Sequence, residues 1–255
     1  MLKANIETFL ACDASYEKAG IVLYGAPFDS TTSYRPGTRF GSRAIRSESY
    51  GLESYSPYQD RDLTDYAVFD AGDQELCFGD ASLALKDLRE RAAEIAGDGK
   101  IPFMLGGEHL VTLAPVQALA EKYPDLHIIH FDAHTDLRDD YLGAKLSHAC
   151  VLRRCWEVLG DGRITQFGIR SGDGRNGGWG KEHVTTHPFI VDMEVFRKLF
   201  GNWKENRCIL PWIWMCWIRV CFREQERRNR AESVLRNFDG QSRRSAVQLG
   251  LLDVM

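Results

Sequence analysis

The chain has 255 residues, of which 44% are hydrophobic, and a formal net charge of −4. This is enough apolar material for one large core, and the mildly acidic balance gives no reason to expect nucleic acid or an anionic membrane as a partner. The seven cysteines lack metal-finger spacing and the N-terminus lacks an apolar run, so the sequence predicts free thiols in a cytoplasmic protein.

Short apolar runs alternate with helical patterns over about the first 205 residues. Strands are predicted at 21–24, 67–69, 101–105, 126–131 and 164–169. Helices are predicted from Asp80 to Gly97, after Gly107 to about Lys122, and over 151–159. Strands separated by helices form a mostly parallel sheet with helices on both faces, so the sequence predicts a three-layer α/β/α fold. Ligands gather at the carboxyl ends of such strands.

Two predicted strands end in clusters of histidine and carboxylate. Gly106-Gly107-Glu108-His109 follows one strand, Asp132-Ala133-His134-Thr135-Asp136 follows another, and Ser147-His148-Ala149 comes later. Imidazoles and carboxylates together suit Mn, Fe, Zn or Co. Two such cations that share a water lower the pKa of that water. The sequence therefore predicts a metal site at the carboxyl edge of the sheet.

The other histidines, and the Asp-x-His pair taken alone, have simpler interpretations. A lone Asp-x-His pair is most often a surface turn, or a carboxylate that satisfies a buried histidine. His127 and His130 fall within a predicted strand and are interpreted as structural. His183 and His187 fall in a predicted loop with no partners nearby, and are interpreted as incidental.

The order and spacing of these motifs resemble those of the ureohydrolase family of arginases and agmatinases, and are most similar to bacterial agmatinases. The resemblance covers roughly residues 15–200. Besides Gly107-Glu108-His109, Asp132–Asp136 and Ser147-His148-Ala149-Cys150, it rests on Gly25-Ala26-Pro27-Phe28-Asp29, Arg35-Pro36-Gly37-Thr38-Arg39-Phe40-Gly41, Ile45-Arg46, Asp70-Ala71-Gly72-Asp73 and Phe167-Gly168-Ile169-Arg170-Ser171-Gly172.

The resemblance implies an arginase-like fold with two Mn²⁺ ions and a small guanidino substrate. His109, Asp132 and Asp136 would ligate one ion, while Asp132, as a bridge, and His134 would serve the other. His148 resembles the family's second-sphere histidine, which carries a proton to the departing amine. Applied to agmatine, the implied hydrolysis yields putrescine and urea. The family also assembles as trimers or hexamers, so a homo-oligomer is expected.

The family's second metal motif, Asp-x-Asp-x-x-Asp-Pro, does not occur after Ser171. The motif can be read from the stretch Pro211–Arg219 in another reading frame. Because tryptophan and methionine each have a single codon, the nucleotide sequence of this stretch is largely fixed by its amino acids. Read from the third base, this stretch gives three aspartates at that spacing, with valine and leucine between them, and permits the final proline. The forced aspartates fall at Trp212/Ile213, Trp214/Met215 and Trp217/Ile218. A frameshift that begins between about Asn202 and Leu210 is therefore predicted.

The predicted organisation is an incomplete ureohydrolase domain over residues 1–205, followed by a frameshifted segment over 206–255. Loss of a bridging carboxylate and a further ligand predicts a chain that is weakly folded or inactive. One alternative is a non-catalytic remnant that acts as a subunit of an intact copy. Another is a metal-dependent deacetylase on a related fold, which Arg35-Pro36-Gly37 and Gly168-Ile169-Arg170-Ser171 disfavour. Agmatine, guanidinobutyrate and other guanidino substrates remain open.

Overall fold

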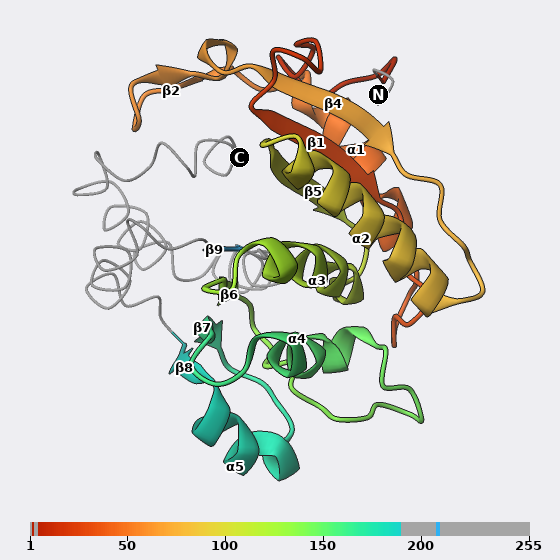
Figure 1. Cartoon of the computed structure of the whole chain (residues 1–255), viewed down its shortest axis with the longest axis vertical. Helices are drawn as coiled ribbons and strands as arrows, with labels where there is room; N and C mark the ends of the chain where they lie inside the picture. Colours follow the sequence, from red (N-terminus) through yellow and green to blue (C-terminus); the bar gives the residue numbers. More distant parts are fainter. Residues whose placement is uncertain (1, 3–4, 190–207, 210–255) are drawn as a thin grey trace, which may run out of the picture. The chain divides into compact units, whose positions relative to one another are not determined.

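The structure, a computed structural model, describes residues 2, 5–189 and 208–209 (Figure 1). The chain divides into two compact units. Of the described residues, the first unit holds 2, 5–119 and 146–148, and the second holds 120–145, 149–189 and 208–209. The predicted domain boundary at 205 and the frameshifted stretch over Pro211–Arg219 lie outside the described residues. Both stay predictions.

The first unit is built on a three-stranded parallel sheet. Strand β1 (Ile21–Ala26) lies between β4 (Val68–Asp73) and β5 (Ile101–Gly106) and pairs with both in parallel. Helix α2 (Ala81–Gly97) packs against β5. It begins where predicted, because the Asp80 carboxylate accepts hydrogen bonds from the first turn of the helix.

The sequence did not predict α1 (Gly41–Ser49), whose residues are mostly small or charged. The helix is held by Arg46, which is 2% exposed. Arg46 Nε and Nη2 donate to the two Asp70 oxygens at 2.8 and 3.0 Å, and Nη1 donates to Asp73 Oδ1 at 2.5 Å. A charge-assisted network in the interior therefore attaches this helix to β4.

The remaining elements that lie wholly or partly in the first unit are short. Strands β2 (Tyr55–Ser56) and β3 (Arg61–Asp62) form a two-stranded antiparallel ribbon. Single 3-10 turns are η1 (Thr38–Phe40), η2 (Leu63–Asp65), η3 (His109–Thr112) and η4 (His148–Cys150). Helix α3 (Leu113–Lys122) follows η3 and ends where predicted. One core cluster is formed by Phe9, Cys12, Leu23, Leu63 and Val68.

The second unit carries a four-stranded parallel sheet. Its order is β8 (Thr185–Pro188), β7 (Ile164–Ile169), β6 (His127–Phe131) and β9 (Cys208–Ile209). The helices that lie wholly within this unit are α4 (Val151–Leu159) and α5 (Gly174–His183). The main sheet of each unit is parallel in its described strands, which confirms the predicted mostly parallel α/β class. Among the described residues, no helix has the length and apolarity needed to cross a bilayer.

The prediction that His183 and His187 lie in a loop without partners is wrong. His183 ends α5, and its Nδ1 lies 2.6 Å from Asp161 Oδ1. His187 lies in β8, and its ring stacks on Phe167 with centroids 4.8 Å apart. Both histidines contribute to packing, because α5 and β8 form where the sequence showed no clear periodicity.

Candidate metal centre

Asp132 follows directly after β6 and is 1% exposed. Its backbone N–H donates to the carbonyl of Phe167 at 3.1 Å, which keeps the chain beside β7 as the strand ends. The backbone N–H of His134 donates to Asp132 Oδ1 at 3.0 Å, and His134 Nδ1 lies 3.4 Å from the same oxygen. The predicted pair Asp132 and His134 therefore lies together in a tight turn.

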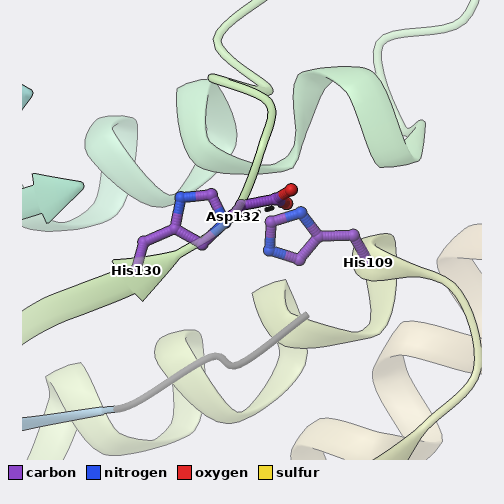
Figure 2. Close-up of side chains that lie close together, drawn as sticks. All are labelled: His109, His130 and Asp132. Atoms are coloured by element: carbon purple, nitrogen blue, oxygen red, sulfur yellow. Dashed lines mark hydrogen bonds and ion pairs between the residues drawn. The ribbon is translucent and has the colours of Figure 1, made fainter. Parts of the chain in front are cut away.

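His130 reaches Asp132 from two residues earlier, within β6 (Figure 2). Its Nε2 lies 3.2 Å from Asp132 Oδ2, and both side chains are buried. Gln166 Nε2 donates to the carbonyl of Thr135 at 2.8 Å and lies 3.0 Å from His130 Nδ1. Since the amide nitrogen only donates, Nδ1 accepts and the ring proton is on Nε2. His130 is thus a neutral donor that fixes the Asp132 carboxylate.

The chain after His134 is held by backbone contacts with the segment after β7. Thr135 N–H donates to the carbonyl of Ser171 at 3.2 Å. A Cβ on Gly172 would come within 2.8 Å of Thr135 Oγ1, so glycine permits this approach. Asp136 adopts a left-handed φ of 47°, and its carbonyl accepts from Leu152 N–H in α4 at 3.0 Å. Asp136 is fixed in the turn, and its role as a ligand stays a prediction.

In the first unit, Gly107 allows the chain to turn sharply out of β5. Its N–H donates to the carbonyl of Ala26 at 3.0 Å, and Glu108 N–H donates to that of Phe28 at 2.8 Å. An added Cβ at Gly107 would lie 2.3 Å from the Phe28 oxygen, closer than any side chain allows. This contact places His109, labelled in Figure 2, at the first residue of η3, where it is partly buried.

Glu108 and His148 share Thr31, which lies in the loop after β1. Thr31 donates to Glu108 Oε2 through its backbone N–H at 2.9 Å and to Oε1 through its hydroxyl. His148 N–H donates to Thr31 Oγ1 at 3.1 Å. Burial raises the pKa of the Glu108 carboxyl, and the Thr31 hydrogen bonds offset only part of that shift.

Three residues of this arrangement were not assigned a functional role from sequence. His130 could have been found, because residues two apart on a strand face the same side, and Asp132 continues that register. Gln166 and Thr31 carry no local signal, since their partners lie 36 and 77 residues away. Only the folded chain brings these groups into contact.

The donor atoms fit a divalent cation that prefers nitrogen and oxygen. His109, His130 and Asp132 each offer an atom that can ligate a metal ion. His130 already uses both ring nitrogens in the Gln166–Asp132 network, so its arrangement suits a residue that orients a ligand. Asp132 is a buried carboxylate, and a cation would compensate its charge.

The family match, the relatives and the solved structures similar to this chain all point to the same family. Residues 19–199 match the arginase family. The agmatinase of Bacillus subtilis is 47% identical over 200 residues, which are 77% of this chain and 69% of that protein. The N(1)-aminopropylagmatine ureohydrolase of Thermococcus kodakarensis is 43% identical over 158 residues, which are 61% of this chain and 53% of that protein. The crystal structure of the agmatine ureohydrolase of Thermoplasma volcanium superposes with a TM-score of 0.73 at 33% identity, covering 82% of this chain and 71% of that one. The chain therefore belongs to the arginase family of ureohydrolases, as the order of its motifs predicted.

Proposed function

We propose that the chain hydrolyses the guanidino group of agmatine, with putrescine and urea as products. The observation that carries this proposal is the family match over residues 19–199, which includes all five predicted site residues. Relatives named as agmatinases match over about three quarters of the chain. The buried Asp132, oriented by His130, is the kind of carboxylate that such a site requires.

In this proposal His109, Asp132 and Asp136 would hold one Mn²⁺ ion. Asp132 and His134 would hold a second, so the Asp132 carboxylate would serve both ions. A pair of divalent cations would supply a water of lowered pKa for attack on the guanidino group. Asp132 suits the bridging role because hydrogen bonds from His130 Nε2 and from the His134 backbone already fix its two oxygens.

His148 is proposed to carry the proton that the departing amine requires. Imidazole suits this task because its ordinary pKa lies close to neutral pH, so it gains and loses a proton readily. The His148 backbone is held by Thr31 Oγ1 at 3.1 Å, which fixes the start of η4. A backbone held in this way limits the positions that the ring can reach.

We propose agmatine rather than another guanidino compound because the chain has higher sequence identity to relatives named as agmatinases. The agmatinases of Bacillus subtilis and Bacillus anthracis are 47% and 48% identical, whereas the aminopropylagmatine ureohydrolase is 43% identical over a shorter stretch. A side-by-side assay with agmatine, aminopropylagmatine and guanidinobutyrate tests the preference. Faster urea release from either of the other two would contradict it.

The second candidate function is that of a non-catalytic subunit of an intact relative. It is favoured by one observation, the lack of an Asp-x-Asp-x-x-Asp-Pro stretch after Ser171. A site without that stretch has fewer carboxylates to hold the second ion, so turnover should be well below that of an intact agmatinase. The expected assembly in either case is a homo-oligomer or a mixed oligomer.

Urea release from agmatine by the purified chain, with and without Mn²⁺, separates the two functions. The intact Bacillus subtilis agmatinase serves as the reference. Slow release that requires Mn²⁺ and disappears in Asp132→Asn supports the enzyme. The matched control is Glu90→Gln, an exposed carboxylate on α2 that should leave the rate unchanged. No Mn²⁺-dependent release from any guanidino compound would contradict the enzyme and favour the subunit.

A further inference from the structure

We infer that Thr31 is a positioning residue that holds the His148 ring in the tautomer with its proton on Nδ1. The inference deepens the proposed function, since it concerns the proposed proton carrier. It rests on hydrogen bonds among Thr31, Glu108 and His148, all of which belong to the first unit. Neither composition nor motif spacing assigns any role to Thr31.

The direction of each hydrogen bond follows from the donors available. A threonine hydroxyl has one hydrogen to give and lone pairs to accept with. That hydrogen goes to Glu108 Oε1, while the Thr31 backbone N–H donates to Glu108 Oε2 at 2.9 Å. Since both carboxylate oxygens accept from Thr31, the hydroxyl oxygen is left to act as an acceptor.

His148 approaches this oxygen with two nitrogen atoms. Its backbone N–H donates to Thr31 Oγ1 at 3.1 Å, and its ring Nδ1 lies 3.5 Å from the same atom, at the long end of the hydrogen-bond range. An oxygen that has already given its hydrogen to Glu108 cannot donate to Nδ1. A hydrogen bond between these two atoms therefore requires the proton on Nδ1, which leaves the lone pair of the neutral ring on Nε2.

This tautomer has a consequence for proton transfer. A histidine that is held at Nδ1 accepts and releases the transferred proton at Nε2, the nitrogen farther from its own backbone. Thr31 thus selects which ring nitrogen reacts without touching the substrate. His130 offers an internal contrast, because the donor Gln166 holds its proton on Nε2.

The test is nitrogen-15 NMR of the full chain, labelled at its seven histidines and studied without metal or substrate. It is recorded near pH 8.5, about two units above the ordinary histidine pKa, so that neutral rings dominate. His148→Gln identifies the His148 signals. Thr31→Val removes the hydroxyl at nearly constant shape, Thr31→Ser keeps it, and Thr32→Val is the matched control, since that hydroxyl donates to the Asp29 carbonyl.

In the unmodified chain, in Thr31→Ser and in Thr32→Val, the His148 proton is expected on Nδ1. Thr31→Val is expected to lose the Nδ1–H signal and gain Nε2–H, while the His130 signals stay unchanged as a check of folding. An Nε2–H tautomer in the unmodified chain would overturn the inference, as would an unchanged tautomer in folded Thr31→Val. If Thr31→Val does not fold, the inference is judged by whether the His148 proton lies on Nδ1 in the unmodified chain and in Thr31→Ser. Because no turnover is measured, a failure of the proposed hydrolysis would leave this result readable.

Discussion

His130 Nε2 donates to Asp132 Oδ2 across 3.2 Å, with both side chains buried at the end of β6. Gln166 fixes the direction of that bond from the other side of the ring, at 3.0 Å from Nδ1. A buried chain of three side chains therefore sets the orientation of the carboxylate that is proposed to bridge two ions.

Replacing Gln166 by leucine should weaken Mn²⁺ binding. The change removes the donor to His130 Nδ1, so the ring no longer has to present a proton to Asp132. Loss of a partner that orients a ligand typically costs about 10- to 100-fold in metal affinity. A Mn²⁺ titration followed by electron paramagnetic resonance measures the change. Thr186→Val, which loses only the bond to Gln166 Oε1, should have a smaller effect. Equal affinities in folded Gln166→Leu and the parent chain would contradict the orienting role.

Replacing Gly107 by alanine should destabilise the chain. The new Cβ would lie 2.3 Å from the Phe28 carbonyl oxygen, so the backbone must move, at a cost of about 1–3 kcal/mol for overpacking. Gly97→Ala is the matched control, because nothing lies within 4 Å of its added Cβ. Alanine there should be neutral or stabilise by up to about 1 kcal/mol. Urea unfolding measures both, and a stable Gly107→Ala chain would refute the predicted crowding.

Breaking the ion pair between Arg46 and Asp70 should be among the most damaging changes in the first unit. Asp70→Asn leaves the buried guanidinium without its full counter-charge, which costs about 3–5 kcal/mol in comparable cases. The exposed pair Lys86–Glu90 on α2 provides the control, and Lys86→Met should cost less than about 1 kcal/mol. Chemical denaturation of the two variants would show similar midpoints if the buried network were unimportant.

The stability of the chain should fall at alkaline pH because of its buried thiols. Burial raises the pKa of Cys12 from 9.0 to about 12 and that of Cys150 to about 11. Below about pH 8 each thiol is almost fully protonated in both states, so it contributes little pH dependence there. Between about pH 9 and 11 the unfolded chain loses protons that the folded chain keeps, so stability decreases as pH rises.

The expected slope is about 1.4 kcal/mol per pH unit for each such thiol. Unfolding free energies of the parent chain and of Cys12→Ala, measured from pH 8 to about pH 11, should diverge in slope. Parallel curves would show that Cys12 ionises equally in the two states.

Part of the fold was readable from the sequence because strands β1 and β7 are apolar and buried and helix α2 has a side-chain cap. The predicted strands at 21–24 and 164–169 became β1 and β7, and the helix after Asp80 became α2 with Asp80 as its cap. Helix α1 was missed because its hydrophobic residues are few and its stability comes from the distant partners of Arg46. Such pairing has no local signature.

The candidate site was readable only in part for the same reason. The turn from Asp132 to Asp136 could be recognised from sequence, because its candidate metal ligands lie within five consecutive residues. The partners that orient it, His130 and Gln166, look like ordinary strand residues until β6 and β7 pair. Thr31 gains its role from Glu108, 77 positions along the chain.

The most direct test of the predicted loss of the second metal motif is the number of Mn²⁺ ions bound per chain. Titration of the metal-free protein, monitored by electron paramagnetic resonance, should find one tightly held ion and a second that binds much more weakly. Asp132→Asn should abolish the tight site, and His109→Ala should weaken it, while Glu90→Gln should leave it unchanged. Two equally tight ions per chain would contradict the prediction that the loss of the second metal motif weakens the second ion's site. Tight binding that survives Asp132→Asn would contradict the site itself.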